Sequence, residues 1–237
     1  MDKYYSQIRQ DEFLNKVIFN NKKNGYFIDI GAHDGHTFNN SLFFEQNNNW
    51  KGICVEPNPN VFNKLNLSRK STNLNVCVGN SNKTVKFTVI EGYAEMLSGI
   101  SEKYDERHFQ RIENNIKNKG GSKKEIELEM IRLDSIVELN DKKIDFVSID
   151  TEGNEFDIIS SINFNKLDIT AIVVENNYND DKINKYLLEL DYIKIIKLDF
   201  DEVYLHKKYI TIGIQLRVII WNFNLIINKV FKKLKLK

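Results

Sequence analysis

The chain has 237 residues, with 34 lysines and arginines against 33 aspartates and glutamates, and 41% hydrophobic residues, which excludes global disorder. Its length suits one α/β domain, alone or with a small appendage. Residues 207–237 hold eight of the bases and no acid, so residues 1–206 carry 26 bases against 33 acids. An acidic body argues against a nucleic-acid-binding core, and we expect no nucleic-acid partner.

Apolar runs alternate with amphipathic segments along most of the chain. Residues 1–24 are expected to hold a leading helix, within about 7–22. Strands are then predicted at about 26–30, 52–55, 74–78, 146–149, 171–174, 192–197 and 202–206, with helices between most of them. The last two strands are expected to form an antiparallel hairpin. This alternation predicts an α/β fold whose mostly parallel sheet has helices on both faces.

The first two predicted strands each end in an acid, Asp29 and Glu56, and the first leads into a turn containing Gly31 and Gly35. Parallel strands deliver such side chains to one edge of a sheet, where nucleosides bind. The G-x-G-x-x-G fingerprint of dinucleotide sites is missing, and acids here would repel a phosphate. S-adenosylmethionine fits better, because it has an ammonium, a sulfonium and no phosphate. In the simpler alternative, Asp29 and Glu56 only cap loops.

Two pairs of polar residues follow the next predicted strands: Asp150 and Glu152 after one, Glu175 and Asn176 after the other. All four are expected to lie together where the methyl acceptor binds. Asp150, Glu152 and Glu175 are expected to be catalytic. In one interpretation, Asp150 or Glu152 is a general base that deprotonates a hydroxyl. In the other, Asp150, Glu175 and Asn176 bind Mg²⁺ through oxygen atoms. That arrangement resembles catechol O-methyltransferase and its metal-dependent relatives.

Four motifs together resemble the FkbM family of S-adenosylmethionine-dependent methyltransferases over residues 25–206. They are Phe-Ile-Asp-Ile-Gly-Ala-His-Asp-Gly (27–35), Gly-Ile-Cys-Val-Glu-Pro-Asn-Pro (52–59), Arg-Leu-Asp-Ser (132–135) and Ile-Asp-Thr-Glu-Gly-Asn-Glu (149–155). The resemblance implies a Rossmann-like class I methyltransferase fold, a seven-stranded mostly parallel sheet with an antiparallel last strand. It also implies a methionine-binding turn, a ribose-binding acid and a residue on the adenine side. The turn is formed by Asp29, Gly31, His33 and Gly35. The ribose-binding acid is Glu56, and the residue on the adenine side is Asn80.

Two segments lie outside this framework. Residues 91–124 are polar and weakly periodic, and we expect a lid or substrate insertion within the methyltransferase domain, 25–206. Residues 207–237 are predicted to form a basic amphipathic tail. The tail is expected either to lie at a membrane surface, as a peripheral contact through residues 210–237, or to pack on the body or on a second subunit. Localisation is expected to be cytoplasmic, because no signal pattern opens the chain.

The sequence therefore predicts an enzyme that transfers a methyl group from S-adenosylmethionine to a hydroxyl. Members of the resembled family act mostly on oxygen, often on sugar hydroxyls, so the acceptor is expected to be a small molecule or a glycan. Mg²⁺ is a second cofactor only in the metal interpretation. Two alternatives stay open: a nucleotide-dependent oxidoreductase on a similar sheet, and a non-catalytic binding module that keeps the crevice.

Overall fold

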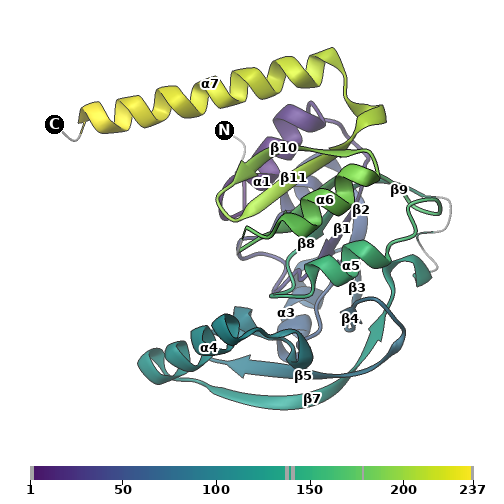
Figure 1. The fold of residues 1–237 in the computed structure, drawn as a ribbon, viewed down its shortest axis with the longest axis vertical. Helices are drawn as coiled ribbons and strands as arrows, with labels where there is room; N and C mark the ends of the chain where they lie inside the picture. Colours follow the sequence, from purple (N-terminus) through teal and green to yellow (C-terminus); the bar gives the residue numbers. More distant parts are fainter. Residues whose placement is uncertain (1–2, 137–138, 140–141, 178, 236–237) are drawn as a thin grey trace.

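The computed structural model describes residues 3–136, 139, 142–177 and 179–235. Within these residues seven strands form one sheet (Figure 1). In spatial order they are β10 (Tyr192–Leu198), β11 (Asp201–His206), β9 (Asp168–Glu175), β8 (Lys143–Ile149), β1 (Tyr26–Ile30), β2 (Lys51–Val55) and β3 (Thr72–Leu74). The connecting helices are α2 (Leu42–Asn48), α3 (Pro59–Ser68), α5 (Glu155–Ser161) and α6 (Asp181–Glu189).

The strands pair in parallel except for β11, which is antiparallel to both of its neighbours, β9 and β10. The predicted α/β class, the mostly parallel sheet and the antiparallel last strand are therefore confirmed. The expected hairpin also forms, but β11 inserts between β9 and β10 and does not extend the edge. This order places the carboxyl ends of β1, β2, β8 and β9 side by side.

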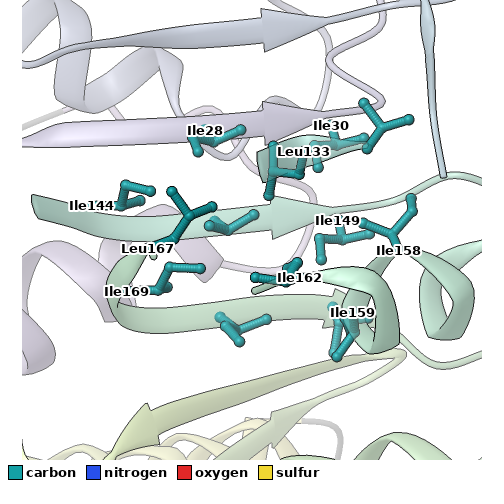
Figure 2. Packing of buried hydrophobic residues seen from close by; sticks show 14 of the residues in the cluster. Ile28, Ile30, Leu133, Ile144, Ile149, Ile158, Ile159, Ile162, Leu167 and Ile169 are labelled. Carbon is teal, nitrogen blue, oxygen red and sulfur yellow. The ribbon is translucent and has the colours of Figure 1, made fainter. Parts of the chain in front are cut away.

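Side chains alternate between the two faces of the sheet, so each face has its own core. Ile28 and Ile30 of β1 point to one face, where they pack with Ile158 and Ile159 of α5 (Figure 2). Phe27 points to the other face, into an aromatic cluster. That cluster includes Phe43, Phe44, Trp50 and Phe146, with ring centroids of neighbouring pairs 4.6–6.1 Å apart.

A smaller four-stranded sheet is built from β4 (Cys77–Val78), β5 (Lys83–Glu91), β6 (Gly99–Ile100) and β7 (Ser122–Ile131) among the described residues. The single strand expected at about 74–78 is thus wrong: the chain leaves the large sheet after β3 and enters the small one as β4. The connection from β5 to β7 contains η2 (Glu95–Leu97), η3 (Ser101–Lys103) and α4 (Glu106–Lys119). In Figure 1 this unit lies at the end of the molecule opposite α7.

The leading helix is shorter than expected. It consists of α1 (Gln10–Phe13) followed by one π-helical segment, η1 (Leu14–Ile18), because left-handed backbone at Arg9 and at Asn20 bounds it on both sides. The tail forms α7 (Ile212–Lys235), which packs against η1. Among the described residues, none of the helices combines the length and apolar character needed to span a bilayer.

Candidate active site

The carboxyl ends of the central strands open into one cavity. Its wall includes Asp29 after the middle of β1, Glu56 directly after β2, and Asp150 and Glu152 after β8. The N-terminal segment contributes Gln7 and Gln10, and the connection between β5 and β7 contributes residues 95–100 and Arg111. The large sheet therefore supplies most of the acids, and the connection between β5 and β7 adds Glu95.

The glycine turn after β1 lies against the backbone of the loop after β8. Gly31 has φ +85°, and a Cβ at this position would lie 1.7 Å from the carbonyl oxygen of Asp150. The Gly31 N–H and the Ala32 N–H both donate to the Val55 carbonyl, at 3.0 Å. His33 also adopts a left-handed φ, +50°. Such backbone values are sparsely populated outside glycine and often mark binding loops.

Asp29 is buried beneath this turn. Its Oδ2 accepts hydrogen bonds from the Asn39 amide at 2.9 Å and the Ser41 hydroxyl at 2.6 Å. The buried guanidinium of Arg69 donates to Asn39 Oδ1 at 3.0 Å and to Ser41 Oγ at 2.9 Å. Burial raises the pKa of Asp29, and the hydrogen bond from Ser41 and the charge of Arg69 oppose that rise. This network, which the sequence did not suggest, fixes the shape of the turn.

Glu56 faces the cavity from the end of β2. Its Oε1 accepts from the Asn58 N–H at 2.8 Å and its Oε2 accepts from the His33 N–H at 3.0 Å. Burial raises the pKa of Glu56 to about 7, despite these two hydrogen bonds. Apolar side chains line the cavity beside it: Ile30, Val55, Val61, Val76, Cys77 and Val78. An acceptor pair next to an apolar slot fits a ribose and a flat base.

The ring of His33 lies under the insertion. Its Nε2 is 3.4 Å from Glu95 Oε1, and its Nδ1 is 3.6 Å from Asp34 Oδ1. Within the described residues, both ring nitrogens are buried without a hydrogen bond. Glu95 belongs to η2, so the connection between β5 and β7 contacts the glycine turn after β1. The lid or substrate role of residues 91–124 stays a prediction, which this contact supports.

Three carboxyl groups meet at the ends of β8 and β9. Oxygen atoms of Asp150, Glu152 and Glu175 lie within 4.8 Å of one another. Asp150 is open to the cavity, whereas the other two are partly buried. Desolvation by the surrounding cavity wall and the neighbouring negative charges raise the pKa of all three groups, that of Asp150 well above its ordinary value although its side chain opens into the cavity. The cluster therefore keeps protons at pH values at which an isolated carboxylate is ionised.

Helix α4 contacts this cluster through Glu152. His108 Nδ1 and Arg111 Nη1 each lie 3.4 Å from Glu152 Oε2. Burial lowers the pKa of His108, so its ring is neutral near pH 7, and the positive charge of Arg111 lowers the pKa of Glu152. Glu152 adopts a left-handed φ of +57°. Its side chain is therefore already engaged by the insertion, while Asp150 faces the open cavity.

Three other polar residues near the predicted site make local contacts. Glu155 accepts from the Thr151 and Gly153 N–H groups at 3.0 and 2.9 Å and so holds the loop after β8. The Asn176 amide forms two hydrogen bonds with the backbone of Asp180. Asn80 donates to Asp157 at 3.2 Å, and it is not among the described residues that line the cavity. Asn80 therefore does not lie at the proposed adenine side of the cavity. The side chain of Asn176 is used in its own turn and is not available to the carboxyl cluster.

The cavity suits a ligand rich in donors and positive charge. Asn40 and Asn154 both line it, and their side-chain oxygens are buried without a hydrogen bond among the described residues. Their amide nitrogens are used, by Ser148 and by the Val78 carbonyl respectively. These unpaired oxygens lie in an acid-lined cavity and can accept hydrogen bonds from ammonium and hydroxyl groups, both of which S-adenosylmethionine carries. A divalent cation would have to be held by Asp150, Glu152 and Glu175.

Comparison with known proteins identifies the class. A seven-stranded sheet with one antiparallel strand and an acid-lined crevice at its carboxyl edge is the class I methyltransferase architecture. A family model described as "Methyltransferase FkbM domain" matches residues 29–194. The chain therefore belongs to the FkbM family and is an S-adenosylmethionine-dependent methyltransferase. No curated protein matches the chain.

Two solved structures are similar to the chain at low sequence identity. One is M. capricolum TrmK in complex with its natural cofactor product, S-adenosyl-homocysteine. It is 11% identical, with a TM-score of 0.43, and the match covers 86% of this chain and 70% of that one. The other is a human methyltransferase 10 domain containing protein. It is 10% identical, with a TM-score of 0.40, and the match covers 83% and 79% of the two chains.

Proposed function

We propose that the enzyme transfers the methyl group of S-adenosylmethionine to a hydroxyl oxygen of a sugar, in a glycan or a glycoconjugate. The observation that supports this is the carboxyl cluster of Asp150, Glu152 and Glu175. It lies at the ends of β8 and β9, whereas Glu56 lies at the end of β2, with β1 between them. The cavity therefore has an adenosine end and a proton-accepting end.

The first end holds the cofactor. Glu56 offers its carboxyl group to the ribose hydroxyls, and the apolar side chains of Val55, Val76 and Val78 enclose the base. The oxygens of Asn40 and Asn154 accept from amino groups. When bound, S-adenosylmethionine supplies an electrophilic methyl group on a positively charged sulfur. Carboxyl groups that ionise beside the sulfonium favour it over the uncharged sulfur of the demethylated product.

Asp150 is the proposed base. A hydroxyl is a weak nucleophile near neutral pH, so its proton must leave as the oxygen reacts. Asp150 is open to the cavity, whereas Glu152 is held by His108 and Arg111. A raised pKa makes a carboxylate a stronger base than an isolated one. The acceptor proton therefore passes to Asp150, and Glu152 and Glu175 set its proton affinity.

The lining of the cavity favours a sugar as the acceptor. Phe38 and Phe200 both line it and are 52% and 53% exposed. Gln7 and Arg111 add amide and guanidinium donors at the same cavity. Exposed aromatic rings next to polar planar groups fit the apolar faces and the hydroxyls of a pyranose.

A divalent cation at the same carboxyl groups is the second candidate. Three carboxylates within 4.8 Å supply the oxygen ligands that Mg²⁺ prefers. Glu152 would take the place that the sequence assigned to Asn176, whose amide is used by Asp180. In this case the cation, and not Asp150, would promote ionisation of the hydroxyl.

The acceptor class is tested by incubating the enzyme with methyl-labelled S-adenosylmethionine and a panel of glycans, glycosides and non-sugar alcohols. We expect label in the sugar fraction, and mass spectrometry should locate one added methylene unit on a sugar ring. Label found only on nitrogen, or only on non-sugar alcohols, would exclude a sugar hydroxyl as the acceptor.

A further inference from the structure

Helix α7 has two apolar faces, and the protein body covers one of them. Ile214 and Trp221 are buried, and Val218 and Leu225 pack beside them on the aromatic core. Arg217 Nε donates to the Val17 carbonyl at 2.7 Å, and the Arg9 guanidinium lies 4.5 Å from the Trp221 ring centroid. These contacts fix the rotation of α7 about its own axis, and they therefore determine which residues face away from the body.

The opposite face is a continuous row of large apolar side chains, which we name the α7 stripe. At 3.6 residues per turn its members fall within an arc of about 120°, centred opposite Trp221. Each of them is 55–76% exposed. They are Ile212, Leu216, Ile219, Ile220, Phe223 and Ile226. A contiguous row of this kind is typical of a surface that binds a partner.

The charge of the tail indicates which partner fits. Residues 207–237 contain eight lysines and arginines and no acid, and five of the lysines fall in the last nine positions. In Figure 1 α7 runs along one side of the molecule and its C-terminal part extends beyond the body. Pairing α7 with its copy would bring two acid-free segments together, which is unfavourable. An anionic surface carries the complementary charge.

We propose that the α7 stripe docks on an anionic lipid surface, with the helix axis in the plane of the membrane. The stripe enters the interfacial region, and the excess positive charge of residues 207–237 attracts anionic headgroups. No described helix is able to span a bilayer, so the contact is peripheral. Trp221 of α7 contacts Arg9 and Phe13, so the helix adjoins the N-terminal segment that contributes Gln7 and Gln10 to the cavity.

Flotation of the full chain with vesicles tests this proposal. The vesicles are phosphatidylcholine alone or phosphatidylcholine with phosphatidylserine. We expect flotation with the second kind only, weakened by salt because surface charges are screened. The double variant Ile219→Ser with Phe223→Ser should lower the bound fraction at least about tenfold, because both side chains leave the interface.

The matched control is Asn222→Ser with Asn224→Ser. Both asparagines are exposed on the same two turns but lie outside the stripe, and neither double variant changes the charge. Thermal unfolding of all three proteins should coincide, since the altered residues are exposed. Equal flotation of the two double variants would overturn the proposal, and so would absence of flotation by the unaltered chain. A dimer in light scattering that the stripe variant abolishes, without vesicle binding, would show that a second copy covers the stripe instead.

Discussion

The α-carbon of Gly31 faces the carbonyl oxygen of Asp150 so closely that a Cβ at Gly31 would lie 1.7 Å from it. The Asp150 N–H also donates to the Ile30 carbonyl at 3.0 Å. The cofactor turn after β1 and the loop that carries the proposed base after β8 are thus one packed unit. Any side chain at position 31 must push the two loops apart.

Replacing Gly31 with alanine is therefore expected to destabilise the protein by more than about 2 kcal/mol, because backbone cannot move away as a flexible side chain can. Gly120→Ala is the control. Gly120 also has a positive φ, +76°, but a Cβ there would meet nothing within 4 Å. Its cost should be only the backbone strain, about 1 kcal/mol. Urea unfolding of both variants measures the difference, and equal losses would contradict the packing argument.

Asp150→Asn tests the proposed base. The amide keeps the size of the side chain but cannot take a proton, so we expect kcat to fall about 10²–10⁴-fold. Cofactor affinity should change less than kcat, because the proposed contacts with the adenosine part of the cofactor come from Glu56 and the apolar side chains at the other end of the cavity. Asp157→Asn on α5 is the control, since Asp157 pairs with Lys103 away from the cavity wall. Equal loss of cofactor affinity and of rate would remove Asp150 from the acceptor side.

Much of the fold followed from the sequence because it depends on periodic patterns. Buried parallel strands read as short apolar runs, and Asp29, Glu56 and Asp150 each stand where such a run ends. The break between β3 and β4 was missed for the same reason. The run from Leu74 to Val78 is apolar apart from Asn75, and one polar residue within a strand-like run does not by itself mark the point at which the chain changes sheets.

The site was harder to predict because it depends on contacts between distant segments. Arg69 reaches Asn39 and Ser41 about thirty residues earlier, a pairing that no local motif encodes. Conversely, Asn176 stands where a ligand was expected, but its amide closes a turn with Asp180. Sequence position placed these residues near the cavity, whereas hydrogen-bond competition determined which side chains remain available.

Glu56→Gln should separate stability from binding. The folded-state pKa of Glu56 is raised to about 7 from 4.5, so the folded protein keeps a proton that the unfolded chain loses. The stability contribution of Glu56 is therefore complete below about pH 4.5 and is lost as pH rises toward 7. Glutamine stays neutral at every pH, but its NH₂ group replaces one of the two oxygens that accept from the Asn58 and His33 N–H groups. The free energy of unfolding of the ligand-free variant should therefore fall less between pH 5 and pH 8 than that of the unaltered protein.

The same variant should bind S-adenosylmethionine at least about tenfold more weakly, because the ribose loses a charged acceptor. Thermal unfolding at pH 5 and pH 8, with and without the ligand, measures both effects. If the free energy of unfolding of the variant falls as much between pH 5 and pH 8 as that of the unaltered protein, burial does not disfavour the charged form of Glu56.

Chelation distinguishes the two roles of the carboxyl cluster. If Asp150 acts as the base, exhaustive dialysis against a chelator should leave the rate of methyl transfer unchanged. A rate that disappears and returns with added Mg²⁺ would instead assign Asp150, Glu152 and Glu175 to a cation. Isothermal titration of the dialysed protein with Mg²⁺ provides a readout independent of activity.

Protonation of the cluster should also be coupled to the charge on the cofactor. Before binding, desolvation and mutual repulsion raise the pKa of Glu152 and of Glu175 to about 8, and they raise the pKa of Asp150 in the same direction. A sulfonium nearby favours their ionised forms, so binding S-adenosylmethionine should release protons, and its affinity should increase from mildly acidic to mildly alkaline pH. S-adenosylhomocysteine has the same ammonium but an uncharged sulfur, so its affinity should depend less on pH. Calorimetry in buffers of different ionisation enthalpy counts the protons released by each ligand. Identical proton release would place the sulfur away from the carboxyl cluster, and with it the proposed site of methyl transfer.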